Sequence, residues 1–310
     1  MADDREIERQ IWEGKVPIVF NLAQSEVTGD EPPEPYYLLA PRCSYLPLVT
    51  TKVKKHFQST GTDTEDEMWF DYAGQALKWH YPIGVLFDFY GSPSQLPWSV
   101  TVHFQGFPED EVLRCPDKET VETHMIATIK EADYLKNGST KKLLAMLKKD
   151  QKQLWMGLKT FKFDQFWSVN KRLTQRDETD PFKNVPFRIY VPDQPVLQEP
   201  FPPFRQDGSE YTLGDLLATV LPELFPAERV SPFLVAFNAA AAEARAAEGG
   251  APEDVPVAPP SSLGKQVELP QIVLHGISPA FETPLLWLGE HCCYPDNFLH
   301  ICILPSELTA

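Results

Sequence analysis

The side chains best suited to covalent chemistry in this sequence are its five thiols, Cys43, Cys115, Cys292, Cys293 and Cys302. A cysteine acts as a nucleophile through its thiolate, which requires a lowered pKa and usually a neighbouring base. Cys115 precedes a proline, and Cys292 and Cys293 follow His291, so a thiol-dependent transferase is one hypothesis. The odd number of cysteines and the lack of a C-x-x-C motif favour instead reduced, structural thiols in a cytosolic protein.

Metal and nucleic-acid chemistry are disfavoured. The seven histidines are scattered without an H-x-x-x-H motif, and the cysteine spacing fits no zinc site, so we expect no metal and no cofactor. The formal charge of −16 argues against a nucleic-acid partner, because proteins that bind nucleic acids usually carry a basic surface. The acidic start of the chain has no apolar signal-peptide core, and no run of about 18 apolar residues predicts a membrane span.

Five lysines lie close together in this acidic chain, and they are Lys141, Lys142, Lys148, Lys149 and Lys152. A run of this kind is ordinarily the solvated face of a helix. The alternative is contact with anionic lipid or with an acidic partner. The sequence leaves both interpretations open.

These lysines belong to the longest part of the chain with helical spacing, at about residues 117–173. Val121, Met125 and Ile129 recur four residues apart, which builds one apolar helix face. Gly138 and the serine after it divide the span into at least two helices. Aromatic residues in the same span indicate the core of this region rather than a binding site, and they are Trp155, Phe163, Phe166 and Trp167.

The segments on either side of this span show the same order of elements, which predicts an internal repeat. In the first segment we expect strand, strand, helix, strand, short helix and strand, at residues 15–22, 36–41, 46–57, 68–72, 82–88 and 98–104. In the second we expect a strand from Phe187, a proline-rich hairpin and a helix capped by Thr212, and then elements that mirror the end of the first segment. The hairpin lies at residues 191–203, and the later elements lie at residues 271–275, 283–290 and 298–304.

One insertion distinguishes the two segments. Pro17 and Pro186 are 169 positions apart, whereas Pro82 and Pro284 are 202 apart, so the second copy needs about 33 additional residues. The Ala-, Glu- and Pro-rich stretch at residues 236–265 supplies them. Because this stretch has few large apolar residues to offset the entropy of ordering, we expect a mobile loop.

The order β-β-α-β-α-β is that of the ubiquitin-like, or β-grasp, fold. We therefore predict an α+β protein in which two ubiquitin-like domains flank a helix-rich domain. The expected boundaries are an N-terminal helix at 1–14, a first ubiquitin-like domain at 15–106, a helix-rich domain at 107–180 and a second ubiquitin-like domain at 181–310.

Residues 5–13 are predicted to form a short amphipathic helix that ends at Gly14. Its apolar side carries Ile7, Ile11 and Trp12. This side either packs on the first ubiquitin-like domain or meets a helix of a partner.

Long, aromatic-rich strings recur along the chain, among them Pro35-Tyr36-Tyr37-Leu38-Leu39, Leu77-Lys78-Trp79-His80-Tyr81-Pro82-Ile83-Gly84, Lys130-Glu131-Ala132-Asp133, Phe163-Asp164-Gln165-Phe166-Trp167 and Tyr294-Pro295-Asp296-Asn297-Phe298-Leu299-His300-Ile301. In these strings the chain resembles the autophagy protein 5 family. The resemblance covers nearly the whole length except residues 236–265, and it implies the fold already predicted.

The resemblance also implies a covalent role in which this chain is modified. One lysine of the family receives the C-terminal glycine of the ubiquitin-like autophagy protein 12 through an isopeptide bond, and the matching position is Lys130. The residues alone do not select it, because Lys136, Lys141 and Lys142 are equally suited. An unperturbed lysine pKa of about 10.4 leaves little neutral amine at pH 7, so the activating and conjugating enzymes must supply most of the catalysis.

The resemblance implies two further partners. The conjugate would bind the coiled-coil autophagy protein 16, and Ile11, Trp12 and Arg42 are the candidate contact residues. The complex would promote transfer of an Atg8-type protein to phosphatidylethanolamine by bringing the conjugating enzymes of the autophagy system to the membrane. We therefore expect a non-catalytic, cytoplasmic scaffold that is peripheral on the forming autophagosome, or preautophagosomal, membrane. An interaction scaffold that is never conjugated is the alternative.

Overall fold

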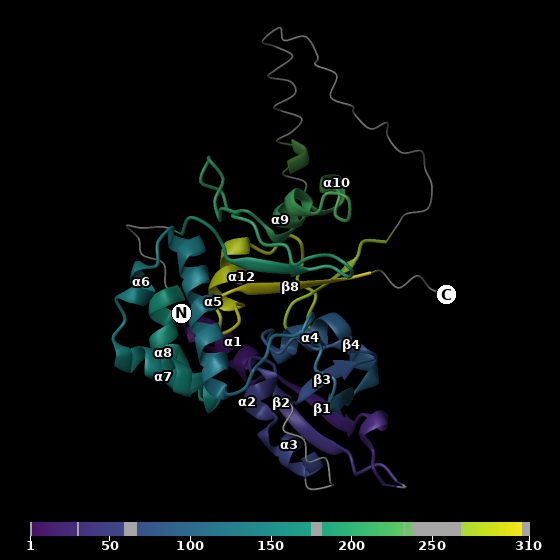
Figure 1. Cartoon of the computed structure of the whole chain (residues 1–310). Coiled ribbons are helices and arrows are strands. Elements are labelled where there is room, and N and C mark those ends of the chain that lie inside the picture. The colour runs from purple at the N-terminus through teal and green to yellow at the C-terminus, as the bar shows by residue number, and fades with distance from the viewer. Residues whose placement is uncertain are drawn as a thin grey trace.

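The computed structural model describes residues 2–29, 31–58, 67–174, 182–231, 234–236 and 268–305. In these residues the chain forms two small sheets with a set of helices beside them (Figure 1). The insertion predicted at residues 236–265 lies almost entirely outside the described residues. Among the described helices, none combines the length and the apolar character that crossing a membrane requires.

The first ubiquitin-like domain is built on a five-stranded sheet in the order β2-β1-β5-β3-β4. Strands β1 and β5 are parallel, and both β1–β2 and β3–β5 are antiparallel. Val16, Ile18 and Phe20 alternate inward along β1 and are buried, which places the core on one face of the sheet. The elements are β1 (Lys15–Leu22), β2 (Tyr36–Pro41), α2 (Leu46–Val49), α3 (Thr51–Gln58), β3 (Trp69–Tyr72), β4 (Gln75–Ala76), α4 (Ile83–Tyr90) and β5 (Trp98–His103).

The helix predicted at residues 46–57 is divided into α2 and α3. Thr50 ends α2, and its hydroxyl donates to the backbone oxygen of Leu46 at 2.7 Å. A threonine hydroxyl competes in this way with regular helical bonding, which explains the break. Both pieces still bury apolar side chains on the sheet, including Leu46, Val53 and Phe57.

The helix-rich domain consists of α5 (Lys118–Asn137), α6 (Lys141–Leu144), α7 (Lys148–Lys159) and α8 (Phe163–Thr174). The break predicted at Gly138 is confirmed, because this residue has φ of 67° and ends α5 in the left-handed region. The core predicted from the four aromatic residues is also confirmed, since Trp155, Phe163, Phe166 and Trp167 are all buried.

The second ubiquitin-like domain repeats the central part of the first. Its sheet has the order β6-β8-β7, with β6 and β8 parallel and β7 and β8 antiparallel, as in β1-β5-β3. As predicted, Thr212 caps a helix, and its hydroxyl accepts from the backbone N–H of Asp215 at 3.2 Å. The elements are β6 (Phe187–Tyr190), α9 (Leu213–Val220), α10 (Ala227–Val230), β7 (Gln271–Val273), α12 (Leu285–His291) and β8 (Leu299–Leu304).

The hairpin predicted at residues 191–203 is mostly not formed. Within the described residues it contributes one isolated bridge, between Ile189 and Leu197, and no strand. Prolines explain the difference, because each lacks the N–H that a sheet ladder needs, and this stretch contains five of them.

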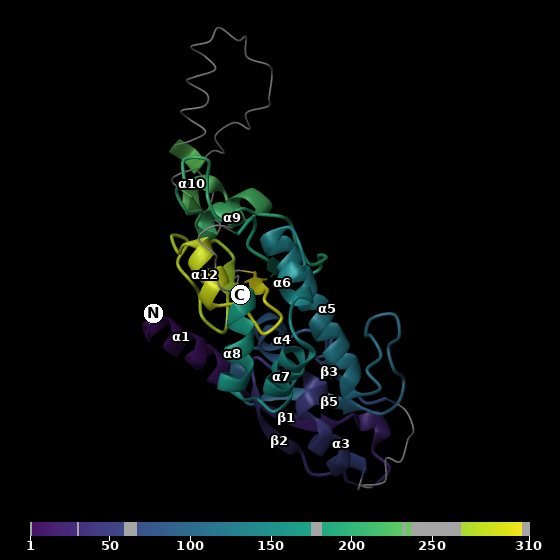
Figure 2. The ribbon, with the colours of Figure 1, turned by 90° about the vertical axis from the view of Figure 1, so that its left-hand side faces the viewer.

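Helix α1 (Ala2–Glu13) lies beside the helix-rich domain, close to α8 (Figures 1 and 2). The two ubiquitin-like domains meet where α4 packs against β8, and α8 of the helix-rich domain contacts the loop before β8. There the thiol of Cys302 donates to the Val85 oxygen at 3.8 Å, and the Asn170 amide in α8 donates to Asn297 at 3.0 Å. The helix-rich domain therefore contacts the loop before β8, and β8 itself contacts the first domain.

Candidate functional site

Helix α5 places Lys130 on the surface. The helix begins after Asp117, whose carboxylate caps it by accepting the Thr120 backbone N–H at 2.8 Å. Val121, Met125 and Ile129 are buried on its inner face, as their spacing predicted. Lys130 lies on the outer face and is exposed, and Tyr134, one turn further on, is 59% exposed. The Lys130 amine is thus accessible to a macromolecule.

The second ubiquitin-like domain holds the part of α5 that carries Lys130. Glu131, the next residue, accepts hydrogen bonds from Arg188 in β6 at 3.0 Å and from Gln198 at 2.6 Å. Further along, the backbone N–H of Lys183 donates to the Lys136 oxygen at 2.8 Å. These contacts fix the direction in which the outer face of α5 points.

The four lysines that are equally suited as acceptors by residue type differ in how deeply they are buried. Lys136 is only 3% exposed, its ammonium lies 4.5 Å from the ring centroid of Phe182, and its Nζ has no hydrogen-bond partner among the described residues. Burial lowers the pKa of Lys136. Lys141 is exposed and Lys142 is partly exposed, so accessibility excludes Lys136 as an acceptor but not these two.

The apolar side of α1 is used inside the chain. Trp12 is 2% exposed and stacks on Phe161 with ring centroids 4.9 Å apart, and it also contacts Phe163 and Phe166. The expectation that this side packs on the first ubiquitin-like domain is therefore wrong for Trp12, which packs on the helix-rich domain. Direct contact of its side chain with a partner would require it to leave this cluster, and that contact stays a prediction.

Ile11 and Arg42, the other two candidates, also contact the rest of the chain. Ile11 is partly buried, and it packs against the core of the second ubiquitin-like domain and against a core that the helix-rich domain shares with the first domain. The thiol of Cys43 in the first domain donates to the Ile11 backbone oxygen at 3.7 Å. Arg42 is buried and forms an ion pair with Asp88 in α4. The second carboxylate oxygen of Asp88 accepts the backbone N–H of Gly276 at 3.0 Å, so this pair joins the two ubiquitin-like domains. Burial raises the pKa of Asp88, and the Arg42 guanidinium opposes that shift.

An exposed aromatic residue near α1 was not selected by the sequence analysis. Trp287 in α12 is 37% exposed, its ring stacks on His291 at 5.0 Å, and α12 contacts α1. Trp287 belongs to a short apolar string, Pro284-Leu285-Leu286-Trp287-Leu288, in which Leu285, Leu286 and Leu288 are buried. The period of a short helix does not tell which of several adjacent apolar residues faces outward.

Two histidines near the domain contacts are kept neutral by burial. Burial lowers the pKa of His80 to about 3, with a further contribution from His124, and burial lowers the pKa of His275 to about 3. The rings of His80 and His124 are 5.4 Å apart, between the first domain and α5. His275 stacks on Tyr294 at 4.1 Å.

Acid is therefore expected to destabilise the fold. Because the folded pKa values lie below the unfolded value of about 6.5, only the unfolded chain takes up these protons as the pH falls from 6.5 towards 3. At pH 5.5 the two histidines together should cost about 2–3 kcal/mol of unfolding free energy relative to pH 7.5. Urea denaturation at both pH values measures this loss, and His80→Phe should reduce it by roughly half. Equal losses in the two proteins would contradict the assignment.

The thiols do not have the properties of nucleophiles. Burial raises the pKa of Cys43, Cys115, Cys292 and Cys293 to about 12, and it also raises the pKa of Cys302 well above its usual range. A thiol transferase needs the opposite shift. Among the described residues, no group of three or more metal-ligating side chains is found.

Comparison with known proteins agrees with this architecture. Three family models match: Autophagy protein ATG5, UblA domain, at residues 11–104; its alpha-helical bundle region at 118–176; and its UblB domain at 184–303. Autophagy protein 5 of Drosophila melanogaster is 38% identical over 98% of both chains, and that of Dictyostelium discoideum is 31% identical over 98% of this chain and 96% of the relative.

A solved structure supports the fold independently. The crystal structure of Kluyveromyces marxianus Atg5 has a TM-score of 0.70 and 16% sequence identity, and the match covers 96% of this chain and 99% of that chain. At this low sequence identity, the structural similarity is evidence for the fold alone. Together with the three matched domains and the 38% identical relative, it leads to one conclusion: the chain belongs to the autophagy protein 5 family.

Proposed function

We propose that this chain is the acceptor of a ubiquitin-like modifier, autophagy protein 12, through an isopeptide bond at Lys130. The observation that supports the proposal is the position of Lys130, exposed on a long helix whose direction is fixed by Glu131 and Arg188. In a reaction of this kind the lysine amine is the nucleophile that attacks the donor thioester, and the acceptor protein needs to supply no catalytic thiol and no general base. The raised pKa values of the thiols favour a non-catalytic chain over the alternative of a thiol transferase.

Mapping of the branched peptide tests this proposal. The full chain is incubated with purified modifier, activating enzyme, conjugating enzyme and ATP, and the product of higher mass is digested and sequenced by mass spectrometry. We expect the modifier's C-terminal glycine on Lys130. If the glycine were found on Lys141 or Lys142, that lysine would be the acceptor instead of Lys130. The lack of any adduct would favour a scaffold that is never conjugated.

We propose further that the conjugate binds the coiled-coil autophagy protein 16 and acts as a ligase-like scaffold for lipidation of an Atg8-type protein. The supporting feature is the region where α1 meets α12, because it combines the partly exposed Ile11 with the exposed Trp287. A helix of the partner that packs here would cover apolar area contributed by two domains. The helix-rich cluster around Trp12 would then hold α1 in place for binding.

We also propose that the five clustered lysines of α6 and α7 make peripheral contact with a membrane. The five lysines at α6 and α7 surround two leucines, Leu144 and Leu147, which are 66% and 65% exposed. Lysines attract anionic lipid headgroups, and exposed leucines between them can enter the interface. The combination favours a lipid surface over an ordinary solvated helix face.

Binding to vesicles containing phosphatidylserine should depend on this run. Because each lysine near an anionic surface contributes about 1 kcal/mol, Lys148→Glu with Lys149→Glu should weaken binding by at least about 30-fold. Vesicle co-sedimentation measures the loss, and added salt should weaken the parent protein too. Lys52→Glu with Lys55→Glu, on exposed positions of α3, is the matched control. Equal loss in both variants would argue for a general effect of charge instead.

A further inference from the structure

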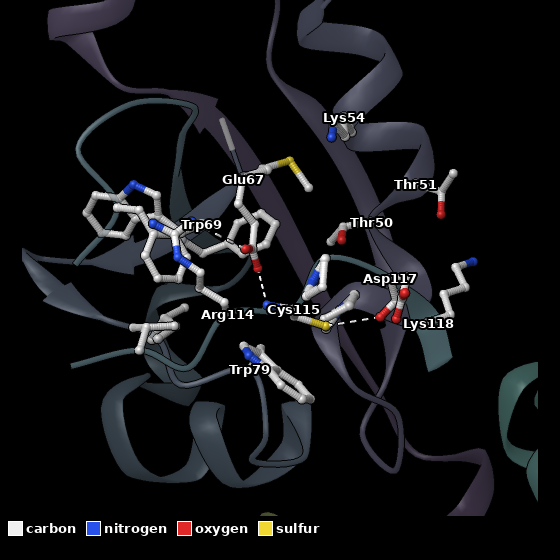
Figure 3. Close-up of a pocket in the computed structure, with 17 residues that line it drawn as sticks. Thr50, Thr51, Lys54, Glu67, Trp69, Trp79, Arg114, Cys115, Asp117 and Lys118 are labelled. Carbon is white, nitrogen blue, oxygen red and sulfur yellow. Dashed lines mark hydrogen bonds and ion pairs between the residues drawn. The ribbon is translucent and has the colours of Figure 1, made fainter. Parts of the chain in front are cut away.

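A cavity of about 460 Å³ opens between the first ubiquitin-like domain and the segment that leads into α5 (Figure 3). Its walls are largely apolar, and their main residues are Trp69, Phe70, Trp79 and Phe107. Trp69 and Phe107 are only partly buried, so the cavity offers aromatic surface to a ligand. The volume falls within the range of roughly 300–1,000 Å³ that is usual for ligand pockets.

The two carboxylates in the wall already have partners. Asp117 accepts hydrogen bonds from the backbone N–H and the hydroxyl of Thr120, both at 2.8 Å, and so caps α5. Glu67 accepts the backbone N–H of Cys115, and its other oxygen lies 3.8 Å from the Arg114 guanidinium. These contacts hold the wall together.

Two lysines line the same cavity without such partners. Lys54 projects from α3 and Lys118 from the first residue of α5, and both are labelled in Figure 3. Among the described residues, neither ammonium group has an ion pair or a hydrogen bond. The charged lining of the cavity consists of three cations, Lys54, Arg114 and Lys118, and two carboxylates, Glu67 and Asp117, so it has a net positive charge in a chain of net charge −16. Electrostatic complementarity therefore favours an acidic ligand with an apolar part.

We propose that this cavity binds a short acidic segment of a partner protein, with one large apolar side chain on the aromatic wall and carboxylates at Lys54 and Lys118. The site does not depend on Lys130 being an acceptor. Cys115 lies in the cavity, where its thiol donates to the backbone oxygen of Asp117 at 3.4 Å, and burial raises its pKa to about 12, which does not suit a nucleophile.

Cys115 instead provides a reporter. It is partly exposed, whereas Cys43, Cys292, Cys293 and Cys302 are buried. Slow alkylation of Cys115, followed by mass spectrometry of the intact folded chain, reports whether a ligand covers the cavity. The protein needs no engineered label.

The experiment selects ligands without assuming their sequence. A dodecapeptide display library is panned on the immobilised full chain, and the enriched peptides are synthesised. Binding is measured to the parent protein, to Lys54→Glu with Lys118→Glu, and to Lys52→Glu with Lys55→Glu. The last pair has the same change in charge on exposed α3 residues outside the cavity. Thermal denaturation checks that all three proteins are folded.

We expect enriched peptides in which acidic residues flank a Trp, Phe or Leu. They should bind about tenfold more weakly to the cavity variant, bind normally to the control, and slow the alkylation of Cys115. Failure to enrich any sequence, enrichment of neutral or basic sequences, equal weakening in both variants, or an unchanged alkylation rate would each overturn the proposal. Equal protection of Cys115 by inorganic phosphate would also overturn it, because the site would then bind a simple anion.

Discussion

Lys130→Arg is expected to abolish the adduct of higher mass, with conjugation falling at least about 100-fold in a reconstituted assay. Arginine keeps the positive charge and the length of the side chain, but its guanidinium, with a pKa above about 12, is not a nucleophile for the thioester. Because Lys130 is exposed and its side chain is not needed for packing, the substitution should leave the folded structure intact. Gel mobility and intact mass measure the adduct.

Lys141→Arg is the matched control, since Lys141 is also exposed and lies just beyond the end of α5. It should be conjugated at the parental rate. Persistence of the adduct in Lys130→Arg, with loss in Lys141→Arg, would assign the acceptor to Lys141. Because both substitutions keep the positive charge, loss in both variants would mean that the Lys141 side chain is also needed for conjugation, and the acceptor would then not be assigned to Lys130 alone.

Asp88→Ala is expected to lower the unfolding free energy by about 3–5 kcal/mol, because it leaves the Arg42 guanidinium buried without its ion-pair partner. The Asp88 and Arg42 side chains are only 4% and 10% exposed, so water cannot compensate fully. The substitution also removes the acceptor of the Gly276 backbone N–H, which links the first domain to the second. Denaturant unfolding measures the free energy, and the midpoint of thermal unfolding should fall by roughly 6–10 °C.

Asp164→Ala supplies the comparison. Asp164 pairs with Arg5 at 2.7 Å and with Arg9 at 3.1 Å, but its side chain is 64% exposed. Exposed ion pairs of this kind contribute about 0–1 kcal/mol. If the two alanine variants were equally stable, the buried pair would not be a structural link between the domains.

The elements that the sequence predicted best are those whose periodicity is set by one buried face. Strand β1 was predicted with its observed bounds, because Val16, Ile18 and Phe20 alternate without interruption. The end of α5 was predicted because Gly138 is suited to the left-handed conformation. In both places a local rule and the global fold favour the same structure.

The features that could not be predicted from the sequence depend on contacts between distant parts of the chain. The amphipathic pattern of α1 indicates that Trp12 needs an apolar surface, but it cannot identify Phe161 and its neighbours as that surface. The same limit applies to Arg42, since nothing local reveals that Asp88 neutralises it. For the acceptor, four lysines were equal by residue type, and only the packing around Lys136 removed one of them. The lysines of the cavity were missed as well, because Lys54 and Lys118 are distant in sequence and are brought together by the fold.

The place of β8 has a consequence for biosynthesis. This strand is central in the second sheet, between β6 and β7, yet it comes after both of them in the chain, at residues 299–304. The first ubiquitin-like domain has its complete sheet once residue 103 has left the ribosome, and domains generally fold in that order during translation. The second sheet cannot be completed until β8, its central strand, has been synthesised. A ribosome that stops before codon 299 would therefore release a polypeptide in which the first ubiquitin-like domain is folded but the second sheet lacks its central strand. The apolar surface that this leaves exposed would make the polypeptide a substrate for chaperones and proteases.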